Sequence, residues 1–168
     1  MAGTTHTHTA GTAELPKLLA SLLIPLIAGG AGTLATNKNL KTWYPTLEKP
    51  PFNPPNWIFG PVWTTLYLLM GLAQYQVAQQ GGHSATAQRA QRIYGLQLGL
   101  NTLWSLLFFG RRSPAAALIE IAGLWVAVLL TILTFAQISR RAAALLVPYL
   151  LWVSFAGLLN EEIWRRNR

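Results

Sequence analysis

Five long apolar segments, separated by short polar breaks, constrain this chain more than any other feature of its sequence. A helix needs about 20 residues to cross the hydrocarbon core of a bilayer. The segments that approach or exceed this length cover residues 18–35, 57–79, 93–109, 115–138 and 142–163. Most of the breaks are too short to hold a domain, so consecutive helices are expected to be antiparallel neighbours. The sequence therefore predicts an all-α membrane protein, in which residues 17–168 form a single bundle of five transmembrane helices with a structured first loop rich in proline and tryptophan.

The balance of residue types supports a membrane protein. It disfavours binding of nucleic acid and excludes sites that need cysteine. Hydrophobic residues make up 52% of the chain and charged residues only 11%, far from the balance of a soluble globular protein. The net charge of +8 does not indicate nucleic acid, because the basic residues form short pairs between apolar runs and no basic stripe. Such pairs suit anionic lipid headgroups. The chain has no cysteine, so a disulfide or a cysteine-ligated metal is excluded.

Residues 1–16, which begin with the polar stretch MAGTTHTHTAGTAE, are predicted to be a disordered tail. The stretch has no basic start, so neither a secretory signal nor a transit peptide is expected. His6 and His8 lack the third and fourth ligands that a zinc site needs, and no metal site is expected.

The distribution of lysine and arginine predicts an orientation in the membrane. The side that holds the first and third breaks and the C-terminus carries eight of these residues, against five on the other side. Because basic residues are enriched in cytoplasmic loops, the C-terminus and the first loop are expected on the cytoplasmic side.

Three of the expected helices carry a stripe of aromatic and amide side chains at helical spacing. Amides that faced lipid would lack hydrogen-bond partners, so the stripes should point into the bundle. Two interpretations are open. Either the amides form interhelical hydrogen bonds and the aromatic side chains fill the core, or both line an apolar pocket for a flat ligand. The recurrence on three helices favours the pocket. The stripes comprise Trp63, Tyr67, Met70 and Gln74; Gln97, Asn101, Trp104 and Phe108; and Trp152, Phe155, Ala156 and Asn160.

Glu120 is the only acidic residue well inside an apolar segment. An ionisable residue at this depth is either part of a functional site or a near-interface carboxylate. In the second case, its side chain extends to the interface or pairs with a loop arginine such as Arg111 or Arg112.

Gly95 and Gly99 form a GxxxG pair on the segment that also carries Gln97 and Asn101. At about 100° per residue, the glycines fall on the face opposite the amides. Glycine lets two membrane helices approach closely. A homodimer through the Gly95/Gly99 face is therefore a hypothesis.

Three stretches resemble one known family over roughly residues 17–167: WYPTLEKPPFNPPNWIFGPVWTTLY, GLQLGLNTLWSLLFFG and PYLLWVSFAGLLNEEIWRRN. This is the translocator protein family, also called TspO, peripheral-type benzodiazepine receptor or tryptophan-rich sensory protein. The resemblance implies a five-helix membrane protein, usually dimeric, that binds protoporphyrin IX and haem. It also implies that the first loop closes over one end of the bundle as a lid. The tetrapyrrole is expected as a ligand, and no cofactor is required.

The resemblance assigns the ligand-binding residues, to which the helical stripe adds Gln97. The expected set is Trp43, Tyr44, Phe52, Trp63, Tyr67, Gln97, Asn101, Trp104, Trp152, Phe155 and Ala156.

The leading functional prediction is a tetrapyrrole-binding sensor, scavenger or transport-associated receptor. The alternative implied by bacterial relatives is a light-dependent, porphyrin-degrading enzyme that uses Trp63 and Trp152 as catalytic residues. Conventional hydrolytic or transferase chemistry is disfavoured, because the inward residues include no acid–base pair, nucleophile or metal cluster. An active exporter is disfavoured by the absence of an evident internal repeat.

One position departs from the family pattern. In animal members, a sterol-recognition pattern has leucine, tyrosine and arginine at the positions of Leu159, Glu161 and Arg165. Because Glu161 replaces the tyrosine, sterol binding is not carried over. The departure favours a bacterial inner membrane over a mitochondrial outer membrane. The expected partners are a tetrapyrrole or lipid-like small molecule, membrane lipid and a second copy of the chain.

Overall fold

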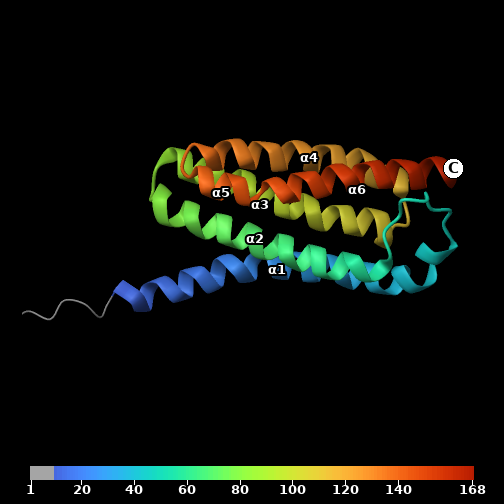
Figure 1. Cartoon of the computed structure of the whole chain (residues 1–168), viewed down its shortest axis with the longest axis horizontal. Helices are drawn as coiled ribbons and strands as arrows, with labels where there is room; N and C mark the ends of the chain where they lie inside the picture. The colour runs from blue at the N-terminus through green and yellow to red at the C-terminus, as the bar shows by residue number, and fades with distance from the viewer. Residues whose placement is uncertain (1–9) are drawn as a thin grey trace, which may run out of the picture.

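A computed structural model describes residues 10–168, and the regular secondary structure in that range is helical throughout (Figure 1). Residues 1–9, which include His6 and His8, lie outside the described residues. The α-helices are α1 (Ala10–Thr42), α2 (Asn56–Gly81), α3 (Ala85–Ser105), α4 (Pro114–Ala136), α5 (Arg140–Leu145) and α6 (Val147–Arg166). A 3-10 turn (Tyr44–Thr46) lies in the first loop, and a π-helical turn (Leu106–Gly110) continues α3.

Within the described residues, three helical stretches are long and apolar enough to cross a membrane: Glu14–Leu34, Pro114–Ala136 and Arg140–Arg166. The third joins α5 and α6, which are separated by Leu146 alone. Helices α2 and α3 are not among these three stretches, although two of the predicted apolar segments lie on them. Tryptophan, tyrosine and glutamine lower the mean hydropathy of α2, and arginine and glutamine lower that of α3.

Several helices extend beyond the predicted apolar segments. Residues 10–16, expected in the tail, form the first turns of α1, and α1 continues to Thr42 rather than ending near residue 35. Helix α3 begins at Ala85 rather than near residue 93, because the Ser84 hydroxyl caps it by accepting a hydrogen bond from the Ala87 N–H at 3.1 Å. Hydropathy identifies the part of a helix that fits hydrocarbon, whereas caps determine where the helix ends.

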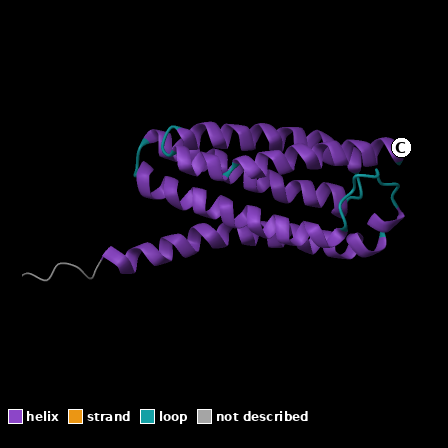
Figure 2. Ribbon diagram, in the orientation of Figure 1, coloured by secondary structure: helices purple, strands orange, loops and turns teal. Residues whose placement is uncertain are grey.

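The helices pack side by side, with the loops gathered at the two ends of the bundle (Figure 2). The main core lies between α2, α3, α4, α5 and α6 and is centred on fully buried side chains such as Met70, Phe135 and Tyr149. Helices α1 and α2 are in close contact where Gly71 faces the backbone of Ser21 and Leu22. Glycine at this position allows the two backbones to meet.

The first loop covers the end of the bundle at which α6 terminates (Figure 1). Tyr44 is only 3% exposed and packs with Phe108 and Phe109 of the π-helical turn. Its hydroxyl donates a hydrogen bond to Asn53 Oδ1 at 2.7 Å. Burial raises the pKa of Tyr44 to about 12, opposed by this hydrogen bond, so the phenol stays protonated at neutral pH. The loop is therefore a structured lid, as predicted. We call residues 43–55 the lid below.

Candidate functional site

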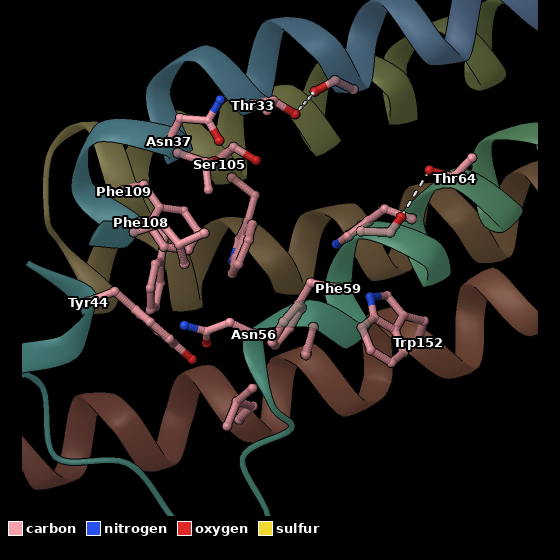
Figure 3. Close-up of a pocket in the computed structure, with 18 of the residues that line it drawn as sticks. Thr33, Asn37, Tyr44, Asn56, Phe59, Thr64, Ser105, Phe108, Phe109 and Trp152 are labelled. Carbon is pink, nitrogen blue, oxygen red and sulfur yellow. Dashed lines mark hydrogen bonds between the residues drawn. The ribbon is translucent and has the colours of Figure 1, made fainter. Parts of the chain in front are cut away.

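A cavity of about 570 Å³ lies between α1, the lid, α2, the end of α3 and α6 (Figure 3). This volume is within the usual range for small-molecule sites. Aromatic side chains supply much of the wall. They are Tyr44, Trp57, Phe59, Trp63, Tyr67, Trp104, Phe108, Phe109, Trp152 and Phe155.

The aromatic rings are in contact with one another around the cavity. Trp63 stacks on Tyr67 with 5.4 Å between ring centroids, and Phe59 meets Trp152 edge to face at 5.9 Å. Figure 3 shows Phe59 and Trp152 reaching the cavity from α2 and α6. Mutual contacts of this kind restrict the rotamers of the rings, so the wall is largely formed before a ligand arrives.

The cavity wall also includes polar side chains, but it carries no formal charge. The hydroxyls of Thr33 and Thr64 donate to carbonyls of their own helices at 3.0 and 2.9 Å, so they offer only lone pairs to a ligand. Asn37, Asn56 and Ser105 also line the cavity (Figure 3). Among the described residues that form the wall, none is aspartate, glutamate, histidine, lysine or arginine. The cavity therefore suits a flat apolar core with neutral polar groups.

Two predicted ligand contacts lie behind the wall instead of on it. The Asn101 side chain accepts a hydrogen bond from the Tyr67 hydroxyl at 2.8 Å and donates one to the Tyr149 hydroxyl at 3.1 Å. Gln97 is fully buried beside Met70 Sδ. Asn101 therefore holds Tyr67 in place, and neither amide lines the cavity.

Two lid residues from the predicted set also fall outside the lining. Trp43 packs edge to face on Phe108 at 5.7 Å, and Phe52 is 51% exposed with its ring 6.4 Å from Phe155. The other predicted residues do line the cavity. These are Tyr44, Trp63, Tyr67, Trp104, Trp152, Phe155 and Ala156.

Helix α1 contributes a wall that the predicted set did not include. Gly29, Thr33 and Asn37 line the cavity at a spacing of four residues. This spacing was the available signal, since it places the three on one helix face. Gly32 lies close to Ser105: a Cβ atom added at Gly32 would be 3.0 Å from the Ser105 hydroxyl oxygen.

A model of the TspO/MBR family matches residues 21–165. The chain belongs to this family. It is 46% identical over 151 residues to the tryptophan-rich protein TspO of Archaeoglobus fulgidus, covering 90% of this chain and 97% of that protein. It is 40% identical over 147 residues to the translocator protein of Bos taurus, covering 87% of each. A tryptophan-rich sensory protein of Cereibacter sphaeroides is 40% identical over 149 residues, covering 88% of this chain and 92% of that protein.

Membership in the TspO/MBR family and the three apolar helical stretches identify the chain as a membrane protein. The predicted family resemblance is confirmed. The aromatic cavity lies within the residues that the family model matches.

Glu120 does not form the predicted pair with Arg111 or Arg112 in this family member. Both carboxylate oxygens are buried without a hydrogen-bond partner, and no ion pair among the side chains that the structure describes includes Glu120. The Arg112 guanidinium instead donates to Asn39 Oδ1 at 2.9 Å. Asn39 reaches Arg112 because α1 continues to Thr42. Glu120 does not line the cavity, and a functional role for it stays a prediction.

The glycine pair of α3 lies on an open face, as its spacing predicted. Gly95 and Gly99 are exposed, and a side chain added at either position would meet no atom within 4 Å. Gln97 and Asn101 point the other way, into the bundle. The dimer through this face stays a hypothesis.

Asn160 lines the cavity and connects α6 with α3 and α4. It is 1% exposed, accepts a hydrogen bond from Trp104 Nε1 at 3.1 Å and donates one to the Pro114 carbonyl at 2.7 Å. Replacing Asn160 by leucine should lower the free energy of unfolding by about 1–3 kcal/mol, because two partly buried groups lose their partners. Detergent-induced unfolding followed by circular dichroism measures the loss.

The neighbouring exposed residue offers a matched control for Asn160. Glu161→Gln should leave the midpoint of unfolding unchanged. An Asn160→Leu variant as stable as the parent would show that water or a rotated Trp104 replaces the bridge.

Proposed function

We propose that this chain binds tetrapyrroles, such as protoporphyrin IX or haem, in the aromatic cavity and serves as a sensor, scavenger or transport-associated receptor. We further propose that five helices span the membrane, with α5 and α6 counted as one, and that the lid and the C-terminus face the cytoplasm. A bacterial inner membrane is the favoured location. The observation that carries the binding proposal is a cavity of about 570 Å³ with an aromatic, uncharged wall.

The chemistry of a porphyrin fits this wall. The macrocycle is flat and apolar, and each aromatic contact adds about 0.5–1.5 kcal/mol beyond the burial of area. Its two carboxylates would remain outside the uncharged wall, near the headgroups. No ion pair among the described side chains includes Lys41 or Arg111, so these two are available to the carboxylates. Lys49 and Arg112, by contrast, already bind the lid and Asn39.

Binding to the purified protein in lipid nanodiscs tests the proposal. Protoporphyrin should quench tryptophan fluorescence with saturation, and Trp63→Phe or Trp152→Phe should weaken binding several-fold by removing contact area. Trp125→Phe is the matched control, since Trp125 donates a hydrogen bond to Ser154 at 2.8 Å and lies outside the cavity. Saturation no different from that of empty nanodiscs would refute tetrapyrrole binding.

A second candidate function is light-dependent degradation of the bound porphyrin. One observation favours it: Trp63 stacks on Tyr67 and also meets Tyr149 edge to face, with 6.2 Å between centroids. A photoexcited porphyrin can take one electron from an indole, which leaves a porphyrin radical anion and an indole radical cation; dissolved dioxygen would be the oxidant that cleavage of the ring requires. In the binding experiment, light-driven loss of porphyrin absorbance that Trp63→Phe abolishes, with binding retained, would support the enzyme. Loss at the rate of free porphyrin supports binding alone.

A further inference from the structure

The lid is joined to α6 by a side-chain amide that pairs with a backbone peptide. Asn167, one residue beyond α6, accepts a hydrogen bond from the Glu48 N–H at 3.0 Å and donates one to the Glu48 carbonyl at 2.9 Å. The two residues are 119 positions apart in the sequence. We propose that Asn167 is a positioning residue that latches the lid over the cavity.

The Asn167 side of this latch is fixed to the bundle. The Asn167 side chain also donates to the Ile163 carbonyl at 2.7 Å, and its backbone N–H donates to the Trp164 carbonyl at 3.3 Å. Ile163 is 1% exposed and lines the cavity. The amide that holds the lid is therefore oriented by the same helical turn that forms part of the cavity wall.

The lid is also held by contacts among its own residues. The Lys49 ammonium donates to the Leu47 carbonyl at 2.9 Å and lies 4.9 Å from the centroid of the Tyr44 ring. A cation over an aromatic face is attracted by the ring quadrupole. Residues 44–49 thus form one unit that includes Tyr44, a residue of the cavity wall. Holding Glu48 therefore holds Tyr44 in the wall.

The latch is placed to open reversibly. Both hydrogen bonds between Asn167 and Glu48 are exposed to solvent, so water competes for each group when they separate. Their loss would change how often the lid opens and would leave the bundle folded. The role in ligand retention rests on the proposed binding function, but lid opening itself can be measured without a ligand.

The absence of cysteine in the sequence allows a direct measurement of lid opening. A cysteine at Leu47, a half-buried lid residue that packs against the cluster of Tyr44, Phe108 and Phe109, reports opening through its rate of labelling by a maleimide. In this background, Asn167→Ala should raise the labelling rate about five- to tenfold, the effect of losing two exposed hydrogen bonds. A cysteine at His83, in the turn at the opposite end, should label equally fast with or without Asn167→Ala.

Two further variants separate a latch from a general loss of structure. Asn167→Asp keeps the acceptor for the Glu48 N–H but loses the donors to the Glu48 and Ile163 carbonyls and places a carboxylate against both, so it should label at least as fast as Asn167→Ala. Glu48→Ala keeps both backbone groups and should label at the parental rate. Equal labelling of Asn167→Ala and the parent would overturn the latch, and so would faster labelling of Glu48→Ala that matches Asn167→Ala.

The same variants test the consequence for the cavity. With bound protoporphyrin, Asn167→Ala should raise the dissociation rate by a factor similar to the gain in labelling. Faster labelling with an unchanged dissociation rate would overturn the role of the latch in ligand retention. If no protoporphyrin binds but Asn167→Ala still labels faster, the latch stands and the proposed ligand is wrong.

Discussion

Replacement of Gly29 by alanine should weaken binding of protoporphyrin by about tenfold or more. A side chain at Gly29 would overlap the ring of Tyr67, whose Cε2, Cζ and Oη atoms are its nearest neighbours. Tyr67 would have to move away from α1, which disturbs its stacking on Trp63 and its hydrogen bond to Asn101. Overpacking of this kind costs about 1–3 kcal/mol, and about 1.4 kcal/mol corresponds to a tenfold change in affinity. Fluorescence titration in nanodiscs measures the change.

The next residue along α1 supplies the control for Gly29. Gly30 also lines the cavity, but a side chain there would meet no atom within 4 Å. Gly30→Ala should therefore bind protoporphyrin with nearly parental affinity. Equal affinities for the Gly29→Ala and parental proteins would mean that Tyr67 can shift without altering the cavity.

Gly71→Ala should destabilise the fold itself, by about 2–3 kcal/mol. An added side chain at Gly71 would come within 2.8 Å of Leu22 Cα and of the Ser21 carbonyl oxygen. These are backbone atoms of α1, so no rotamer change can relieve the overlap and the two helices must separate. The midpoint of detergent-induced unfolding should fall accordingly.

Gly123 on α4 provides the matched comparison, because a side chain there meets no atom within 4 Å. Glycine inside a helix costs about 0.5–1 kcal/mol relative to alanine, so Gly123→Ala should be neutral or slightly stabilising. If Gly71→Ala unfolds at the same midpoint as Gly123→Ala, close contact between α1 and α2 is not needed for stability.

The aromatic cavity was predictable to the extent that it depends on helical periodicity. Trp63, Tyr67 and Trp152 face inward because each helix must place its aromatic and amide stripe in the bundle, and this requirement is visible in the sequence. Periodicity predicts which side chains point into the bundle, but not whether they line the cavity or are buried behind its wall. Gln97 and Asn101 point inward as predicted, yet they lie behind the cavity wall and hold other side chains.

The remaining parts of the site depend on contacts between segments far apart in the sequence. The length of α1 brings Asn39 to Arg112, one of the two arginines expected near Glu120. The pairing of Asn167 with Glu48 joins an asparagine after the last helix to an ordinary loop peptide. Neither contact has a periodic signature, and so neither could be predicted from the order of residues.

Because the cavity wall is uncharged, the ring and the acid groups of an acidic ligand would be recognised in different places. The wall can select a ring by thickness, outline and polarisability, but it offers no counter-ion to an acid group. Under the proposed function, discrimination between acid groups falls to the lipid headgroups and to Lys41 and Arg111. The selectivity of this protein would then vary with the composition of the leaflet around it, which makes the lipid bilayer a component of the binding site.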